Sequence, residues 1–491
     1  MVDETEPLLG RARTKSIDNG DYKLVDFSPD GDKENPLDWS KAYKFEVVAL
    51  LSFMAFTVSF TCIGVVPVAD RIVFDLGGGE SKAASILLVT VWELGEAAGP
   101  FLMAPLSEIY GRYPVFNVAN IIFIFGVVLG ALSHTTSLFI FSRLLTGFAV
   151  ASNVLNPAII GDIYKSESRG SGMSLVMFAP LIGGTVGPAI SGVLAETVGW
   201  RNILWLCAGV ATLCEILFCT LLRETYKVTI LQRRAARLRM ETKDESLQCA
   251  WETEGGDTVR SWAKLRTAIT RPLLVMSSSA VLQIMSFYAG FAFTFYYIVA
   301  TTLPGILRET YNFSPSQTGS VFICFSMGAI LAIVVCNLLI DRIYVKLAKS
   351  HGGIGRPEFR LPFMIGGAAL LPVVVGLYGW VPYTDSSVYL LLAVVAALGF
   401  ASIVIAIPMS SYIVDSFGIY SASAMTVVLL TRCSMGTLLP LCIPLLTDVV
   451  GLGYGFLVLA AICLVVIPLP VLMMRYGSRW RQRSSYTAVA K

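Results

Sequence analysis

The sequence contains few charged residues for its length. Asp, Glu, Lys and Arg together make up 14% of its 491 residues, whereas 55% are hydrophobic. Soluble domains carry roughly 25% charged residues, so a water-facing surface of this size is excluded. A disordered chain or a coiled coil is excluded too, because each needs a more polar or a strictly periodic composition. The composition indicates a membrane protein, in which each spanning helix takes about 20 apolar residues.

Residues that bind metals or nucleotides are also scarce. The chain has two histidines, His134 and His351, and its ten cysteines form no CxxC or Cys/His cluster. Zinc sites are built from such clusters, so we expect no metal site. The chain has no Gly-Lys dipeptide and therefore no Walker A phosphate loop, which excludes an ATP-driven pump. We expect neither enzymatic activity nor a cofactor.

Apolar runs make up most of the chain, six before and six after a polar stretch. They lie near residues 45–67, 83–105, 114–132, 138–163, 173–197, 201–222, 272–300, 317–340, 361–381, 387–411, 420–447 and 452–474. This layout predicts an all-α membrane protein with twelve transmembrane helices in two six-helix bundles. The expected parts are an N-terminal tail (1–44), a first bundle (45–222), a central loop (223–271), a second bundle (272–474) and a C-terminal tail (475–491).

Lys and Arg are distributed unevenly between the two sides of these spans. With the N-terminus inside, 31 of the 37 fall on the inner side and four on the outer side. The positive-inside rule therefore predicts that both tails and the central loop are cytoplasmic. The triplet Asn312-Phe313-Ser314 then falls in an outer loop, which makes Asn312 a candidate glycosylation site.

The central loop contains a basic run, Arg233, Arg234, Arg237 and Arg239. Such a run could contact anionic lipid headgroups at the cytoplasmic leaflet. The interpretation we prefer is a solvated linker helix whose charges follow the positive-inside rule.

Two glutamates lie inside the second apolar run. Inserting an ionisable side chain into the membrane there raises the free energy by roughly 3 kcal/mol. Glu93 and Glu96 are three residues apart, so they share one face of a helix. Desolvation and a neighbouring carboxylate both raise the pKa of a carboxyl group, so the pair is a candidate for carrying a proton. The alternative is a pair of hydrogen-bonded structural glutamates that never change protonation.

Other charges also fall within the spans. Arg143 opens the fourth run and stays protonated, so it could hold a nearby carboxylate ionised. Alternatively, it is an interfacial arginine whose side chain reaches the headgroups. Glu215 and Arg432 are further intramembrane charges, and the sequence does not identify their partners.

Small residues are concentrated in the fifth run. Gly183 and Gly187 are four residues apart, which allows the backbone of a neighbouring helix to approach closely, and the pattern continues to Gly192. Pro188 removes one helix hydrogen bond and favours a kink. A close-packed and bendable helix suits two bundles that must rock against each other.

Six short segments match motifs known from one family of transporters, in the same order. They are residues 35–40 (NPLDWS, tryptophan motif), 104–112 (APLSEIYGR, motif A), 143–147 (RLLTG, motif B), 183–192 (GGTVGPAISG, motif C), 356–361 (RPEFRL) and 412–418 (YIVDSFG). On these motifs the chain, from Asn35 onward, resembles the major facilitator superfamily, in particular its fungal twelve-span drug:proton antiporters. Motif C is the antiporter signature of that family.

The resemblance implies a cytoplasmic charge network that latches one conformation. Glu108 and Arg112 of motif A would belong to it, together with Asp162 or Arg169 at the end of the fourth span. Gly111 would permit the tight turn between the second and third spans.

The resemblance also implies roles deeper in the membrane. Arg143 would support proton coupling, and Gly187 with Pro188 would carry the antiporter kink. The chain departs from the usual motifs at four positions, Ala104, Tyr113, Ser174 and Ser191.

Aromatic residues are concentrated in the seventh run. Tyr296, Phe291 and Tyr288 are our candidates for a substrate cavity, because aromatic rings stack on planar or lipophilic ligands. We expect export of lipophilic small molecules, such as drugs, toxins or a fungal secondary metabolite, in exchange for protons by alternating access. The proton gradient would supply the energy. The expected partners are substrate, protons and membrane lipid, with no nucleic acid, and the chain is expected to act as a monomer.

The same arrangement of helices is compatible with two other functions. An uptake carrier would accumulate its substrate, and motif C argues against it. A non-transporting sensor would signal through a tail, but fewer than twenty residues follow Arg475. For location we favour the plasma membrane. Residues 4–9 (ETEPLL) resemble an acidic dileucine signal, so a vacuolar or endosomal membrane is the alternative.

Overall fold

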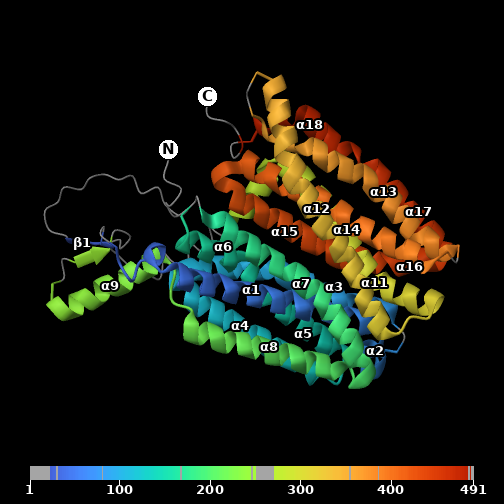
Figure 1. The fold of residues 1–491 in the computed structure, drawn as a ribbon, viewed down its shortest axis with the longest axis horizontal. Coiled ribbons are helices and arrows are strands. Elements are labelled where there is room, and N and C mark those ends of the chain that lie inside the picture. Colours follow the sequence, from blue (N-terminus) through green and yellow to red (C-terminus); the bar gives the residue numbers. More distant parts are fainter. Residues whose placement is uncertain are drawn as a thin grey trace.

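The computed structural model describes residues 23–28, 31–79, 81–165, 168–244, 247–249, 270–352, 355–384, 386–484 and 487. Nearly all of these residues are helical, and the long helices form two groups that lie side by side (Figure 1). We call the end that carries α2 (Ala69–Val73) and α16 (Cys442–Val450) the far side, and the end that carries α9 (Lys227–Thr242) the tail side. The segment 4–9 lies outside the described residues.

The helices follow the apolar runs because backbone groups in lipid must be hydrogen-bonded within their own segment. The first group contains α1 (Lys41–Gly64), η2 (Val66–Val68), α2, η3 (Phe74–Gly78), α3 (Lys82–Tyr110), α4 (Arg112–Ala131), α5 (Thr136–Phe148), α6 (Ser152–Ile163), α7 (Arg169–Thr197) and α8 (Trp200–Leu221). The second contains α11 (Ala280–Tyr311), α12 (Pro315–Ser350), η5 (Pro357–Arg360), α13 (Leu361–Tyr383), α14 (Val388–Phe417), η6 (Gly418–Tyr420), α15 (Ser421–Leu438), η7 (Leu439–Leu441), α16, α17 (Leu452–Val466) and α18 (Pro468–Arg481).

The expected all-α membrane fold is confirmed. Within the described residues, eleven helical segments are long and apolar enough to cross a membrane. The fourth predicted span, 138–163, is divided between α5 and α6, and α5 alone is a shorter apolar helix. The division lies at residues 149–151, where the Val150 N–H bonds three residues back to Gly147 instead of four. The boundaries of the five expected parts stay a prediction.

The seventh predicted span, 272–300, is helical from residue 270 with an interruption at Ser279, and its main helix, α11, ends later than predicted. Ser279 is not helical, and its side chain caps α11 by accepting a hydrogen bond from the Leu282 N–H. At the other end the helix continues through the polar residues Arg308 and Glu309. Hydropathy locates apolar stretches, so it missed both the cap and this polar last turn.

Each group has its own apolar core. Trp92 and Phe123 are fully buried in the first group, and Tyr378 and Phe456 are fully buried in the second. Large apolar side chains also cover the outside, where a membrane protein faces lipid. Among them are Phe125, Phe141, Trp205, Leu338 and Val465.

Two antiparallel seams join the groups. The first seam joins α3 to α15 and, at the far side, to α16, where the Lys82 ammonium lies 2.8 Å from an Asp448 carboxylate oxygen. Further in, the Thr437 hydroxyl donates to the Thr90 carbonyl.

In the α7–α12 seam, the Ser316 N–H donates to the Glu196 carboxylate at the far side. The innermost contact of this seam is a hydrogen bond between the Thr185 and Ser326 hydroxyls. The contacts named for both seams lie between the far side and the middle of the helices.

A small module lies on the tail side of the first group (Figure 1). Strand β1 (Lys23–Val25) pairs in parallel with β2 (Leu247–Cys249), so these two short strands are an exception to the all-α fold. Val25 and Cys249 bury against Leu231 of α9.

The basic run of the central loop lies on α9 and pairs with the N-terminal segment. A nitrogen of Arg234 lies 2.5 Å from an Asp32 oxygen, and a nitrogen of Arg237 lies 3.3 Å from a Glu34 oxygen. The linker helix preferred from the sequence is confirmed, and Arg237 is mostly exposed on it. The sequence did not predict that Arg234 and Arg237 pair with carboxylates of the tail. The hydrogen bond from Arg234 lowers the pKa of Asp32 below its ordinary value of 3.8.

Candidate functional site

A cavity of about 360 Å³ lies between α7 of the first group and α11, α12, α14 and α15 of the second. The cavity begins next to the two seams, because Ser326 of the α7–α12 seam and Arg432 on α15 of the other seam both line it. On α7 and α11 its lining residues Leu181 and Ala289 lie further toward the tail side. The wall is mostly apolar, with side chains that include Leu181, Phe322, Phe325, Ile403, Met409 and Met425.

One face of α11 lines the cavity, through Ala289, Ala292, Phe293 and Tyr296. These residues follow the spacing of a single helix face. Tyr296 therefore lies in the wall. Tyr288 and Phe291, the other two candidates, point to the opposite face and are buried in the core of the second group. Phe293, which the sequence did not single out, lines the cavity instead of them.

Arg432 of α15 carries the only charge among the described residues that line the cavity. Its guanidinium carbon lies 4.2 Å from the centre of the Phe293 ring. Its Nη2 lies 3.3 Å from Oε1 of Glu96 on α3. The intramembrane partner of Arg432 is thus a carboxylate of the opposite group.

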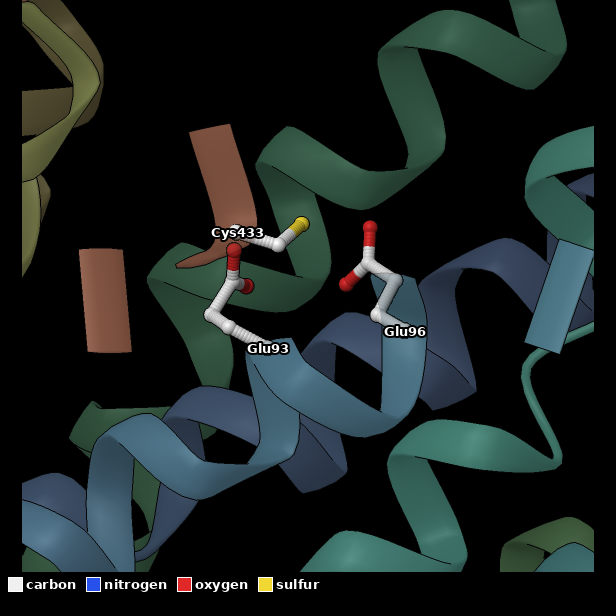
Figure 2. A group of neighbouring side chains, drawn as sticks. All are labelled: Glu93, Glu96 and Cys433. Atoms are coloured by element: carbon white, nitrogen blue, oxygen red, sulfur yellow. The ribbon is translucent and has the colours of Figure 1, made fainter. Parts of the chain in front are cut away.

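Glu93 and Glu96 point from α3 toward α15 (Figure 2). Both are buried. Glu93 accepts a hydrogen bond from the Tyr297 hydroxyl of α11, while its second oxygen is buried without a hydrogen-bond partner in the described structure. Glu96 also accepts from the Trp92 indole N–H. The two carboxyls therefore contact the second group through different residues.

Glu93, Glu96 and Cys433 form one cluster, with a ligand atom from each lying within 4.8 Å of the others (Figure 2). That spacing is short enough for a shared cation. However, Glu96 already binds Arg432 and Glu93 already accepts from Tyr297, so a metal ion would have to compete with both. A proton needs only one carboxyl oxygen, and the second oxygen of Glu93 has no hydrogen-bond partner in the described structure.

Arg143 makes contacts that the sequence did not predict, and its role in proton coupling stays a prediction. It is buried, which rules out an arginine that reaches the headgroups. Its guanidinium donates to the carbonyls of Thr61, Cys62 and Leu88 and lies 4.8 Å from the centre of the Trp92 ring. Helix α1 ends at Gly64, so its last carbonyls lack partners within the helix. Arg143 satisfies two of them and pairs with no carboxylate in the described structure.

The motif A residues meet at the tail side of the first group. Arg112 Nε lies 3.4 Å from an Asp162 oxygen, and Arg112 also donates to the Ser107 hydroxyl. Glu224, which the sequence did not single out, accepts from the backbone N–H groups of Arg112 and Tyr113 at the start of α4. A carboxylate at a helix N-terminus is favourable there because it faces the positive end of the helix dipole.

Gly111 fits this junction for two reasons. Its φ is 102°, a conformation that favours glycine. A Cβ atom at this position would lie 2.2 Å from a Glu224 oxygen. The tight turn expected from motif A is therefore present, and Glu224 fills the space that a side chain would need.

Glu108 and Tyr226 belong to the same region. Burial and the negative charge of Glu108 raise the pKa of Tyr226 to about 12, although Arg112 opposes this. The Arg112 guanidinium carbon lies 4.7 Å from the centre of the Tyr226 ring. The backbone of Arg169 opens α7, but its side chain lies outside the described part of the structure, so its place in the latch stays a prediction.

The motif C residues lie in two contacts of α7. A Cβ at Gly183 would lie 2.4 Å from the Phe56 carbonyl oxygen, and one at Gly187 would lie 2.8 Å from the Phe60 carbonyl oxygen, so α1 and α7 pack backbone to backbone. Gly192 makes a similar contact with the Pro315 carbonyl of the second group. Pro188 lies inside a continuous helix, and the expected kink stays a prediction.

Two further predicted positions lie away from the cavity. Glu215 of α8 is buried and accepts a hydrogen bond of 2.7 Å from Asn120 of α4, within the first group. Asn312 is exposed in the left-handed region that ends α11, near the far side. Its glycosylation stays a prediction.

Comparisons with known proteins point to the same kind of molecule. The sequence profile of the Major Facilitator Superfamily matches residues 48–295 and 285–487. Efflux pump radE of Floropilus chiversii is 31% identical over 470 residues, which cover 95% of this chain and 86% of the pump. MFS transporter prlG of Fungal sp. (strain NRRL 50135) is 33% identical over 464 residues, which cover 94% of this chain and 97% of that protein.

Solved structures agree on the fold. The partially occluded, inward-open xylose transporter XylE from E. coli aligns with a TM-score of 0.63, covering 89% of this chain and 98% of its own. The two sequences are 16% identical, so this likeness concerns the fold alone.

Proposed function

Because this chain belongs to the Major Facilitator Superfamily and is a membrane transporter, we propose that it exports lipophilic small molecules in exchange for protons by alternating access. Helix bundles of this kind bind substrate near the midplane, between two halves that rock against each other.

The contact of Glu93 and Glu96 with the second group supports the proposal most strongly. The two carboxyls are buried, and they contact Tyr297 and the cavity residue Arg432. A proton that binds here changes the charge of a contact that joins the two groups. Proton binding can therefore bias the equilibrium between the two orientations of the cavity.

The seams fit an inward-facing state when the tail side is cytoplasmic, as the positive-inside rule predicts. The pairs Lys82–Asp448 and Ser316–Glu196 then close the outer side, while the cavity extends inward. Rocking would open both seams and give a proton from outside access to Glu93 and Glu96.

The proton gradient is sufficient as an energy source. One charge that crosses 100 mV contributes about 2.3 kcal/mol. A tenfold substrate gradient needs about 1.4 kcal/mol. One proton per cycle would therefore sustain more than a tenfold gradient of an uncharged substrate.

The apolar wall with its phenylalanine rings supports lipophilic substrates, and the name of the relative radE as an efflux pump supports export. We place the protein in the plasma membrane as a single chain.

The test is export of a panel of lipophilic dyes from cells, with and without a protonophore. We expect the wild type to export at least one dye, the protonophore to stop export, and Glu93→Gln to abolish it at equal surface expression. Glu215→Gln is the matched control, because Glu215 is also a buried intramembrane glutamate but pairs within the first group. It should keep most of the export.

Export that continues with the protonophore would contradict proton coupling. Equal loss of export in both glutamine variants would show that any buried glutamate is needed for folding, and would remove the special role of Glu93. Accumulation of the dyes instead of export would favour an uptake carrier.

A further inference from the structure

Arg432 belongs to the cavity wall and to the carboxyl cluster at the same time. It is held by the Phe293 ring and by one contact of 3.3 Å to Glu96, whereas charge-assisted hydrogen bonds are usually about 2.7–2.9 Å long. Its Nε is buried without a hydrogen-bond partner in the described structure. A guanidinium has five donors, so Arg432 is weakly fixed and partly unsatisfied.

The contact of Arg432 with Glu96 depends on the charge of the carboxyls. Two carboxylates outweigh one guanidinium, so a first proton neutralises the cluster and leaves Arg432 paired. A second proton leaves a buried guanidinium without a counter-charge, which is strongly unfavourable. The space beside it is the cavity, where the hydroxyls of Ser326, Ser402 and Ser410 offer acceptors.

We propose that Arg432 makes proton and substrate binding mutually exclusive, by lying against Glu96 while that carboxyl is ionised and entering the cavity when both carboxyls are protonated. This inference rests on the proton-coupled export proposed above and specifies how the exchange works. In this mechanism, the described arrangement, with Arg432 against Glu96, corresponds to the ionised state and can accept substrate from the tail side.

The mechanism specifies the class of substrate. An uncharged lipophilic molecule binds when Arg432 is withdrawn and is expelled when the guanidinium enters. A cation is repelled once the guanidinium enters the cavity, because Arg432 is the only charged residue of the described wall. An anion would bind the released guanidinium and so would bind together with the protons. That would produce co-transport rather than exchange.

The groups around Glu96 are consistent with this assignment. Arg143 of α5 is occupied by backbone carbonyls and does not replace Arg432 as a partner. Among the described residues, the other titratable or charged groups that act on the cluster are Glu93 on α3, Tyr296 and Tyr297 on α11, Arg432 and Cys433 on α15, and Cys62 on α1.

The test measures binding rather than transport. Nile red serves as a neutral probe and anilinonaphthalene sulfonate as an anionic probe, each titrated onto the purified full chain in lipid nanodiscs. Glu93→Gln/Glu96→Gln imitates the doubly protonated state, and adding Arg432→Gln removes the guanidinium. Gly184→Trp supplies the blank, because Gly184 lines the cavity and a Cβ there meets no atom within 4 Å. The signal that remains with Gly184→Trp comes from probe in the lipid, and it is subtracted from the signal of the other samples.

We expect the double glutamine variant to bind Nile red about tenfold more weakly than the wild type and the sulfonate more tightly, a difference of about 1.4 kcal/mol for the neutral probe. Adding Arg432→Gln should reverse both changes. In the wild type, mild acid should weaken Nile red binding, and in Arg432→Gln alone binding should no longer depend on pH. This pH comparison keeps the test decisive if the double variant does not fold.

Unchanged binding of both probes in the double variant would overturn the proposal, because Arg432 would then stay in place. Weaker binding of both probes that Arg432→Gln does not reverse would also overturn it, because the cavity would then have collapsed. Either result could occur while export stays sensitive to a protonophore, in which case the proposed function stands and only the role of Arg432 fails.

Discussion

Gly111 connects α3 to α4 with a φ of 102° and leaves room for only a hydrogen beside Glu224. Gly111→Ala should destabilise the protein by about 1–3 kcal/mol, through backbone strain and displacement of the Glu224 carboxylate. Gly209→Ala is the matched control, because Gly209 lies in α8 and a Cβ there meets no atom within 4 Å. Thermal unfolding of both variants in detergent checks this, and equal melting temperatures would contradict it.

Arg143 has a structural role in this account, as the donor to carbonyls at the end of α1. Arg143→Gln should lower stability by about 1–3 kcal/mol for each buried carbonyl that loses its donor. The transport that remains should keep the pH midpoint of the wild type. Arg201→Gln is the control, since Arg201 is only half-buried and donates to the Ser133 carbonyl. A shifted midpoint in Arg143→Gln, with normal stability, would restore the coupling role that motif B implies.

The sequence located the charged positions but not their partners. Glu93, Glu96 and Arg432 could be recognised as intramembrane charges because hydropathy exposes them. Their pairing depends on how α3 packs against α15, and no local pattern encodes that packing. Tyr288 and Phe291 were misplaced for a related reason, since aromatic content shows that a helix is apolar but not which face meets a cavity.

At the scale of elements, the docking of the N-terminal segment on α9 depends on Asp32 and Arg234. Arg234→Glu should release residues 31–38 and increase their amide hydrogen exchange. The charge swap Asp32→Arg/Arg234→Asp should recover part of the protection. If Arg234→Glu leaves the exchange unchanged, the apolar contacts of Val25 and Leu231 hold the module without the ion pair.

The same docking should depend on pH in one direction. In the docked segment the pKa of Asp32 is below its ordinary value of 3.8. The ion pair therefore contributes its full stabilisation of the docked segment above pH 3.8. It is lost as the pH falls through the lowered pKa. Amide exchange of residues 31–38 should therefore be independent of pH near neutrality, after correction for the intrinsic rate, and should rise only in strong acid. Release near neutral pH would show that another group controls the module.

The helices were more predictable than their exact ends. Long apolar runs fix the number and order of the spans, because lipid leaves no other structure for them. The start of α11 depends on the cap at Ser279, and the division of span four depends on a few hydrogen bonds near Gly147. The β1–β2 pairing joins segments more than two hundred residues apart, so it leaves no trace in either segment alone.

For the whole molecule, alternating access requires the far-side seams to open during each cycle. A disulfide between Thr90→Cys and Thr437→Cys should lock this seam and stop transport, because the hydroxyl of each residue donates to the carbonyl of the other, so the two positions lie close together. The background chain should carry serine at the exposed Cys219 and Cys442. Reduction should restore transport, and either single cysteine variant should transport normally under oxidation. Full transport with the disulfide formed would contradict alternating access through this seam.

The measurement that tests the central claim most directly is proton movement driven by substrate. Purified protein is reconstituted into vesicles that contain a pH-sensitive dye, and a transported neutral compound is added with no initial pH gradient. We predict that substrate moving in one direction drives protons in the other, and that Glu93→Gln/Glu96→Gln vesicles show no pH change. Substrate flux without proton movement, or protons moving in the same direction as the substrate, would contradict the account.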